Sequence, residues 1–243
     1  MTGCDTPSSG GPRLFYDAPF STVPVIIAEE AAFLVVYKPH NMHTAPLGVD
    51  DEGTLLAFCA AAFPETARVH GKKKIEGGLL HRLDYATAGL VLVARNDAAW
   101  ETLSAAQDAG QFSKEYAASC RIKDRTTRLS GDAPFDGALP QVIESGFRPY
   151  GPGRKMVRPV PGGEPCYRTH ILAIHEDTEA RRFRLRLTRG FRHQIRAHLA
   201  WIGFPIMNDT LYGGVEDGGP LALAADTLTF PDPESGLTVR FTL

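Results

Sequence analysis

The chain of 243 residues contains little cysteine. Its four cysteines, Cys4, Cys59, Cys120 and Cys166, lie far apart, and none of their spacings matches the short intervals of a structural zinc site. Isolated thiols of this kind are typical of a protein in a reducing compartment, and they predict a cytoplasmic location. The sequence therefore argues against a small disulfide-stabilised secreted fold and against a zinc-ribbon architecture.

Long apolar runs and internal repeats are also missing from the sequence. No segment reaches the ~20 apolar residues that a membrane-spanning helix needs. The N-terminus has no basic segment followed by an apolar one, so no secretory signal is expected. Residues 1–13 are rich in Gly, Pro, Ser and Thr without apolar periodicity, which predicts a disordered tail. Residues 14–243 are long enough to form a single domain with a sizeable core.

The net charge is only −2, but the charges are unevenly distributed. The segment from Arg148 to Arg196 contains twelve Arg and Lys residues against four Asp and Glu residues, a net charge of +8 that leaves −10 for the remainder. Such asymmetry predicts a cationic face for nucleic acid on an acidic body. The excess of Arg over Lys favours phosphate contact, because the guanidinium fork matches two phosphate oxygens.

Hydrophobic periodicity predicts several strands and few helices. The predicted strands are 32–37, 89–94, 112–122, 170–174 and 182–188, with further strands in 221–243 around a Pro-Glu-Ser-Gly turn. The predicted helices are 50–63, one capped by Asp97 and stopped by Gly110, and 194–202, closed by Gly203. Alternation places Tyr116 on the buried side of its strand. Interleaved strands with few helices favour an α+β fold with a mixed, mainly antiparallel sheet.

Three arginines, Arg182, Arg184 and Arg186, alternate with apolar residues in one predicted strand. One face of this strand is predicted to enter the core, and the other would carry guanidinium groups about 6.6 Å apart, twice the strand rise. This spacing is near that of successive phosphates, so the row is predicted to bind nucleic acid. A solvated charged surface is the alternative interpretation.

Asp84 is a carboxylate held between two apolar stretches. Residues 79–94 read Leu-Leu-His-Arg-Leu-Asp-Tyr-Ala-Thr-Ala-Gly-Leu-Val-Leu-Val-Ala. Burying a carboxylate is costly unless it is paired or hydrogen-bonded. Asp84 is therefore either half of a structural ion pair or a working group, and this segment alone leaves both open.

Five motifs in order carry a resemblance to a known family. They are Leu34-Val35-Val36-Tyr37-Lys38-Pro39, His81-Arg82-Leu83-Asp84, Lys114-Glu115-Tyr116, His193-Gln194-Ile195-Arg196-Ala197-His198 and Asp209-Thr210-Leu211-Tyr212. Together they resemble the RluA-type pseudouridine synthases, and the resemblance runs from about residue 25 to residue 241.

The resemblance implies the pseudouridine synthase fold, a mixed sheet with a central catalytic cleft, and isomerisation of uridine to pseudouridine in tRNA or rRNA. Asp84 matches the family's catalytic aspartate, and Arg196 is expected to be its counter-ion within hydrogen-bonding distance, with a fork that can be bidentate. Tyr116 matches the active-site tyrosine, which is expected to stack on uracil and to act as a base in the final deprotonation. No cofactor or metal is implied. Too few residues precede Lys38 for the S4 module of many relatives, so RNA recognition is expected to rest on the catalytic domain of a monomer.

The remaining motif residues are expected to contact the RNA substrate. Arg82 is expected to fill the space left by a flipped uridine or to hold the backbone, and His81 to fix its loop by hydrogen bonding. The expected substrate-binding residues are Lys38, His81, Arg82, Arg182, Arg184, Arg186, Arg192, His193 and Gln194.

Four positions depart from the family pattern. Ala88 stands where Ser is usual, and Phe191 stands where Arg usually follows Gly. Asn41 and Asn208 stand where Gly is common, and because Asn tolerates a left-handed backbone we expect both loops to keep their shape.

Two other functions compete with this interpretation. A metal hydrolase would use His40 with His43, or His193 with His198, but the first pair has no carboxylate nearby until Asp50 and the second spacing does not suit one helix face. A non-catalytic RNA-binding or RNA-chaperone module is the stronger alternative. It is disfavoured because binding alone needs no buried acid.

Overall fold

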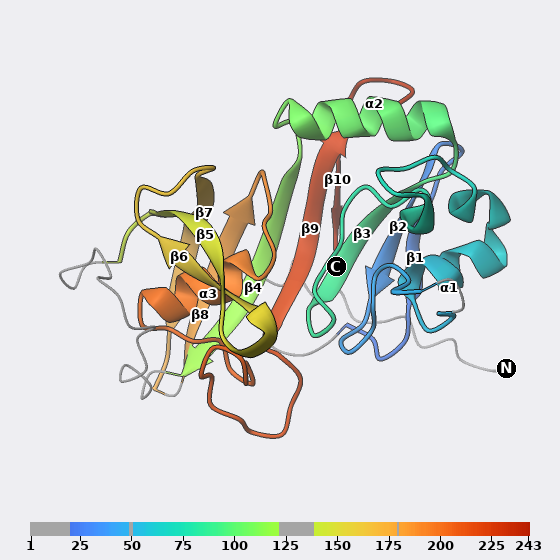
Figure 1. The fold of residues 1–243 in the computed structure, drawn as a ribbon. Coiled ribbons are helices and arrows are strands. Elements are labelled where there is room, and N and C mark those ends of the chain that lie inside the picture. Colours follow the sequence, from blue (N-terminus) through green and yellow to red (C-terminus); the bar gives the residue numbers. More distant parts are fainter. Residues whose placement is uncertain (1–19, 49–50, 122–138, 179) are drawn as a thin grey trace, which may run out of the picture.

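The computed structural model describes residues 20–48, 51–121, 139–178 and 180–243, and the predicted tail lies outside them. A ten-stranded sheet runs through the whole described part of the molecule (Figure 1). Its pairings are antiparallel except between β3 and β9, so the predicted α+β class with a mixed, mainly antiparallel sheet is confirmed. No helix among the described residues is long and apolar enough to cross a membrane.

The elements lie close to the predicted ranges. The strands are β1 (Val25–Glu29), β2 (Phe33–Lys38), β3 (Ala88–Ala94), β4 (Ser113–Arg121), β5 (Val142–Tyr150), β6 (Met156–Val160), β7 (Tyr167–Glu176), β8 (Ala180–Leu187), β9 (Leu223–Pro231) and β10 (Thr238–Thr242). The α-helices are α1 (Leu55–Ala62), α2 (Asp97–Asp108) and α3 (Gln194–Trp201). Short 3₁₀ turns cover Pro64–Ala67, Lys74–Glu76 and Pro152–Arg154.

The strand order is β1-β2-β3-β9-β4-β8-β7-β5-β6, with β10 paired to β9. The short parallel contact between β3 and β9 joins the two halves of the sheet at Gly89 and Ala225. A Cβ on Gly89 would lie 2.1 Å from the Ala225 carbonyl oxygen, so only glycine allows the two strands to approach this closely. Ala225 also pairs with Tyr116 on β4. The start of β3 therefore lies close to Tyr116.

Helix capping explains two differences from the predicted boundaries. Thr54 caps α1 by accepting a 3.2 Å hydrogen bond from the Ala57 amide, so the helix begins later than the predicted residue 50. Asn96 caps α2 in the same way, and Asp97, the predicted cap, occupies the first turn instead.

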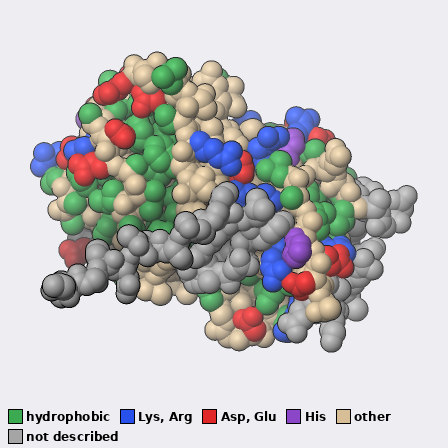
Figure 2. Space-filling view, turned by 180° about the vertical axis from the view of Figure 1, so that it is seen from behind, with side chains coloured by type: hydrophobic (Ala, Val, Ile, Leu, Met, Phe, Trp, Pro, Cys, Tyr) green, Lys and Arg blue, Asp and Glu red, His purple; other side chains and the backbone are tan. Residues whose placement is uncertain are grey.

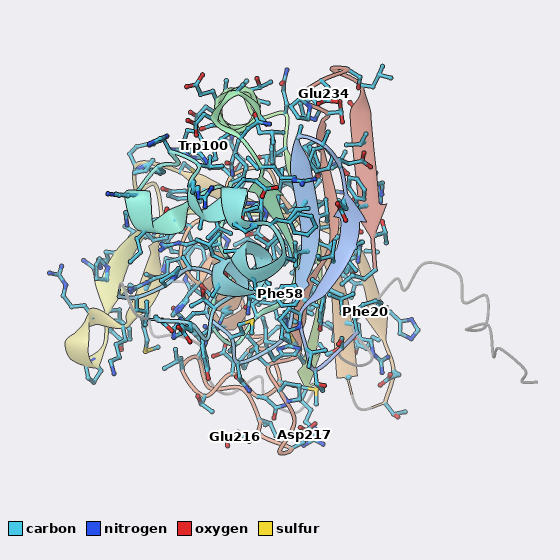
Figure 3. All side chains as sticks on the ribbon, turned by 90° about the vertical axis from the view of Figure 1, so that its right-hand side faces the viewer. Phe20, Phe58, Trp100, Glu216, Asp217 and Glu234 are labelled. Atoms are coloured by element: carbon cyan, nitrogen blue, oxygen red, sulfur yellow. The ribbon has the colours of Figure 1, made fainter. Side chains whose placement is uncertain are left out.

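Two principal hydrophobic clusters form the core. One packs α1 and α3 against the sheet, and it contains Tyr116 and Leu185. The other lies under α2, which crosses one end of the sheet in Figure 1. In Figure 3, Glu234 of the β9–β10 turn and Trp100 of α2 lie near one end of the molecule. Asp217, in the loop after α3, lies at the opposite end. Arg196 of α3 joins this loop to the loop that precedes β3, because it contacts both Asp209 and Asp84.

Candidate active site

Asp84 lies in a loop whose backbone is anchored on both sides of the carboxylate. The Thr44 hydroxyl donates to the Leu83 carbonyl at 2.9 Å and accepts from the Leu83 amide at 3.1 Å. The Lys38 ammonium and the Met42 amide both donate to the Tyr85 carbonyl, each at 3.2 Å. Because the neighbouring peptides are fixed, the position of the Asp84 backbone is set before any ligand binds.

The Asp84 carboxylate faces a guanidinium and an imidazole without accepting a hydrogen bond in the described part of the chain. Its Oδ2 lies 3.6 Å from Arg196 Nη1 and 3.9 Å from His193 Nε2. The side chain is 24% exposed, whereas that of Arg196 is 6% exposed. The carboxylate thus has nearby positive charge and free lone pairs, which suits attack on an electron-poor atom or removal of a proton.

The predicted ion pair between Arg196 and Asp84 is present at 3.6 Å, longer than the predicted hydrogen bond, and the fork of Arg196 is not directed to Asp84. Arg196 directs its fork to Asp209: Nε lies 2.7 Å from Oδ2, and Nη2 lies 2.7 Å from Oδ1. Asp209 is fully buried and also accepts from the Leu211 and Tyr212 amides. Burial lowers the pKa of Arg196, but the hydrogen bonds and charge of Asp209 and the weaker effect of Asp84 raise it overall. Arg196 is therefore a cation fixed by Asp209, and only its Nη1 atom faces Asp84.

Asp209 and Tyr212 are site residues that the residue-by-residue sequence interpretation missed. The Tyr212 ring lies under the Arg196 guanidinium, 5.3 Å from its central carbon. The Tyr212 hydroxyl accepts from the Val157 amide at 2.9 Å and lies 3.2 Å from His193 Nδ1. The Asp-Thr-Leu-Tyr motif was the available signal, because an acid and an aromatic residue within one short motif can support a buried arginine.

Tyr116 lies on the buried face of β4, as the alternation predicted. Burial, and then the charge of Asp84, raise the pKa of its phenol. Within the described residues its hydroxyl makes no hydrogen bond. The free protein thus holds Tyr116 as a neutral phenol near Asp84, with ring and hydroxyl both available to a ligand.

His193 adopts a left-handed backbone with φ 55° at the start of α3. This geometry turns the chain sharply into the helix and brings the imidazole toward Asp84. Burial lowers the pKa of His193, Asp84 raises it, and Arg196 and Arg192 lower it. The imidazole is therefore neutral near pH 7 and can donate or accept a hydrogen bond.

The predicted substrate contacts of Lys38 and Gln194 are wrong. Lys38 is fully buried, and its ammonium donates to the carbonyls of Pro39, Met42 and Tyr85. Burial lowers the pKa of Lys38 to about 7, against the opposing effect of Asp84. Gln194 is also buried, and it bonds the Phe191 amide and the Thr169 hydroxyl. Both side chains hold the loops of the site and do not reach a ligand.

The other predicted contacts lie on the two loops around Asp84. His81 accepts a 3.4 Å hydrogen bond from the Leu92 amide, which agrees with its expected role in fixing the loop. Arg82 is exposed and pairs with Glu76 at 3.1 Å. Arg192 is exposed and donates to the backbone carbonyls of Arg154 and Met156, at the start of β6. The guanidinium groups of Arg82 and Arg192 remain accessible to RNA.

The predicted arginine row is only partly on the surface. Arg184 is 7% exposed, and its guanidinium bonds Glu115, Asp226 and Thr227. Because Leu185 pairs with Tyr116, the arginines of β8 lie on the opposite face of the sheet from the site. The prediction that Arg184 binds phosphate is therefore wrong.

Arg182 and Arg186 remain partly exposed on this far face, and Arg182 pairs with Asp177 at 2.6 Å. Figure 2 shows the molecule from behind: Lys and Arg side chains lie among acidic and apolar ones there, without a continuous basic surface over the coloured part. The positive charge of residues 148–196 is thus partly neutralised by acids from other segments, and phosphate binding by Arg182 and Arg186 stays a prediction.

Arg184→Ala is expected to destabilise the protein by about 3–5 kcal/mol, because it leaves Asp226 buried without its cation, although Glu115 keeps Arg240 3.4 Å away. Urea unfolding measures this change. The matched control is Arg182→Ala, which removes a more exposed pair and is expected to cost less than about 1 kcal/mol. Equal effects of the two substitutions would show that the buried cluster contributes no more than an exposed ion pair.

The residues of the metal-hydrolase alternative have other partners. His40 Nδ1 lies 2.6 Å from the Ala86 carbonyl, and the His43 ring packs 4.7 Å from the Tyr85 ring. His198 lies between the hydroxyls of Ser145 and Thr169. In the described part of the chain, no group of three or more His, Cys, Asp or Glu residues could hold a metal ion.

Three of the four departures from the family pattern have a visible structural basis. Asn41 and Asn208 adopt φ values of 55° and 62°, so the prediction that these loops tolerate asparagine is confirmed. Phe191 stacks on Phe147 with ring centroids 5.2 Å apart and an interplanar angle of 4°. An aromatic contact thus occupies the loop where an arginine is usual. Nothing in the structure explains Ala88.

The sequence matches known RNA-modifying enzymes. The model of the RNA pseudouridylate synthase family matches residues 32–201. The uncharacterised RNA pseudouridine synthase YjbO of Bacillus subtilis is 33% identical over 222 residues, which cover 89% of this chain and 70% of that protein. The ribosomal large subunit pseudouridine synthase D of Haemophilus ducreyi is 30% identical over 191 residues, 78% of this chain and 52% of that protein. The chain thus spans about half the length of the relatives named synthase D.

The fold is also similar to a solved structure. Human RNA pseudouridylate synthase domain containing 1 superposes with a TM-score of 0.63 at 22% identity, covering 93% of this chain and 86% of that one. This similarity identifies the architecture as the pseudouridine synthase fold. The chain belongs to the RNA pseudouridylate synthase family, and the resemblance of its motifs to the RluA-type enzymes is confirmed.

Proposed function

We propose that this protein is an RNA pseudouridine synthase that isomerises a uridine in tRNA or rRNA and uses Asp84 as its catalytic group. One observation carries the proposal: a carboxylate with free lone pairs lies 3.6 Å from a buried arginine and close to a buried tyrosine. Structural carboxylates in folded proteins normally have their lone pairs hydrogen-bonded. Further parts of the proposal are that the protein acts as a monomer in the cytoplasm without a cofactor, and that residues 14–243 form a single catalytic domain.

In this mechanism the glycosidic bond between C1′ and N1 of the uridine breaks, and its electron pair stays on the base. Asp84 either bonds to C1′ or removes a C2′ proton, and both routes need an ionised carboxylate. Arg196 and His193 lie 3.6 and 3.9 Å from that carboxylate, and the guanidinium favours its ionised form. The freed uracil turns on the Tyr116 ring, and C5 bonds to C1′ as the bond between Asp84 and C1′ breaks or as Asp84 returns the proton to C2′. C5 then loses its proton and N1 gains one.

The target uridine must leave its stack to reach Asp84, because the site is made of loops and a buried strand face. Arg82 and Arg192 are exposed on the loops that carry Asp84 and His193. In this proposal both guanidinium groups bind the RNA backbone around the flipped nucleotide. A non-catalytic RNA-binding module would use the same cations, but it would have no use for the free carboxylate.

The experiment that tests this function maps pseudouridines in RNA from cells with and without the gene. One or a few uridines are expected to lose modification in its absence and to regain it when the wild-type gene is restored. Identical maps in both strains, with RNA binding retained by the purified protein, would favour the non-catalytic module. The mapped uridine also defines the transcript for the kinetic tests below.

Tyr116→Phe is expected to keep RNA binding and to slow pseudouridine formation by about 10²–10⁴-fold, as loss of a group that handles a proton does. The raised pKa of Tyr116 means that its phenol can accept the C5 proton only by passing its own proton on, with Asp84 as the near acceptor. Single-turnover rates on the mapped transcript measure this effect. A rate within threefold of wild type would show that only the ring contributes.

A further inference from the structure

Lys114 is a buried cation that the mechanism above does not use. The residue is 5% exposed, and its ammonium reaches neither a hydrogen-bond acceptor nor a carboxylate in the part of the chain that the structure describes. Burial lowers the pKa of Lys114 to about 8, so the side chain is mostly protonated at neutral pH. Keeping a desolvated charge without a partner costs free energy, which points to a ligand that arrives as the partner.

Two loops enclose the Lys114 ammonium. A Cβ placed on Gly190 would lie 3.6 Å from its Nζ, so the loop before α3 touches it. On the other side the ammonium lowers the pKa of the His81 imidazole, whose Nδ1 is buried without a hydrogen-bond partner. Gly190 and His81 each lie three residues before a residue of the proposed site, His193 and Asp84 respectively.

Strand geometry fixes the position of Lys114 relative to Tyr116. The two residues are two apart on β4, so they share a face with their Cβ atoms about 6.6 Å apart. Both side chains are buried on that face of β4, so Lys114 lies one side-chain position along the strand from Tyr116. This separation is about the width of one pyrimidine ring with its carbonyl groups.

A flipped uridine places its sugar at Asp84 and its base beyond the sugar, while its phosphates stay with the RNA outside. The group that reaches the buried Lys114 is then the far edge of the base. We propose, on the basis of the function proposed above, that the Lys114 ammonium donates a hydrogen bond to a carbonyl oxygen of the uracil and stabilises the base as its glycosidic bond breaks.

The charges in this step balance without proton transfer from Lys114. When the C1′–N1 bond breaks, both electrons remain on the uracil, and the negative charge spreads over N1, O2 and O4. Asp84 supplies an electron pair to C1′ and recovers it when C5 bonds there, or it accepts a C2′ proton and returns it at that step, and Lys114 stays an ammonium throughout. Once C5 is bonded to C1′, C5 loses its proton and N1 gains one. Because the charge develops only as the bond breaks, the contact stabilises the transition state more than bound uridine.

Lys114→Met keeps the length of the side chain and removes the charge. Its single-turnover rate on the mapped transcript is expected to fall at least about a hundredfold, as when a donor to a developing anion is lost. RNA affinity and its salt dependence are expected to stay unchanged. The melting temperature is expected to equal or exceed that of wild type, because an unpaired buried charge has been removed. The control is Lys72→Met, the same change at an exposed lysine, with no expected effect.

A transcript with 5-fluorouridine at the target position separates stabilisation of the base from a structural role. Fluorine makes uracil a better anion, so the rate of C–N cleavage in Lys114→Met is expected to fall at least tenfold less on this transcript. Lys114→Gln, a neutral donor, is expected to lie between Met and wild type, and it decides the test if the Met variant is unstable.

Three results would overturn the assignment of Lys114. They are a Lys114→Met rate within tenfold of wild type, equal losses on both transcripts, or a loss explained by weaker RNA binding with a lower salt slope, which would indicate a phosphate contact. A wild-type protein without activity would instead overturn the proposed function itself.

Discussion

Asp84→Asn is expected to reduce pseudouridine formation by about 10⁴-fold or more, the effect seen when a central catalytic side chain is removed. The substitution keeps the size of the side chain and removes the negative charge that both possible routes require. RNA affinity is expected to stay unchanged, because no phosphate contact is lost. Single-turnover pseudouridine formation on the mapped transcript and a filter-binding titration measure the two effects.

Stability separates this prediction from unfolding. Asp84 is partly exposed and accepts no hydrogen bond from the described residues, so Asp84→Asn is expected to change the free energy of unfolding by less than about 1 kcal/mol. Asp108→Asn, the same change at the exposed end of α2, is the control and is expected to keep full activity. A rate for Asp84→Asn within tenfold of wild type, about 1.4 kcal/mol of barrier, would show that Asp84 is not the catalytic group.

Arg196→Ala is expected to remove both activity and stability. The substitution leaves Asp209 fully buried without its cation, which typically costs about 3–5 kcal/mol, and it removes the positive charge beside Asp84. Arg196→Lys keeps the charge and loses the fork, so it is expected to retain part of the activity and stability. Urea unfolding measures the loss of stability. Single-turnover rates, measured under conditions in which each variant is folded, measure the loss of activity separately.

Asp209→Asn tests whether Asp209 acts through Arg196. The substitution is expected to reduce the rate less than Arg196→Ala does, because one hydrogen bond to the guanidinium can remain. In a double-mutant cycle, Asp209→Asn is expected to add little to Arg196→Ala. Additive losses would mean that Asp209 contributes to the reaction independently of the arginine that it holds.

Local pattern was sufficient to predict the strands around the site. The continuous apolar run of β3 and the alternation of β4 predicted both strands, and the alternation also predicted the buried position of Tyr116. Helix starts were less predictable, because Thr54 and Asn96 are caps only through hydrogen bonds that periodicity does not register. The motifs predicted that Asp84, Arg196 and Tyr116 share one cleft. The structure places Arg196 and His193 3.6 and 3.9 Å from the Asp84 carboxylate. Burial raises the pKa of the Tyr116 phenol, and the charge of Asp84 reaches this side chain strongly enough to raise it further.

Partner choice within the site was not predictable from the sequence. Asp84 and Asp209 both lie near Arg196, and which one receives the fork depends on how the loop after α3 folds back over that helix. The alternation around Arg184 predicts its face but not the two carboxylates, Glu115 on β4 and Asp226 on β9, that enclose it. Such pairings depend on strand order and on the β9 bulge, which are properties of the whole sheet.

The central claim is that this protein breaks and remakes the bond between uracil and its ribose. Release of tritium from RNA containing C5-tritiated uridine tests it most directly, because the C5 hydrogen is lost only when C5 becomes bonded to the sugar. With RNA from cells lacking the gene, the wild-type protein is expected to release tritium in proportion to the mapped sites, and Asp84→Asn is expected to release none. RNA binding by the wild-type protein without tritium release would contradict the account.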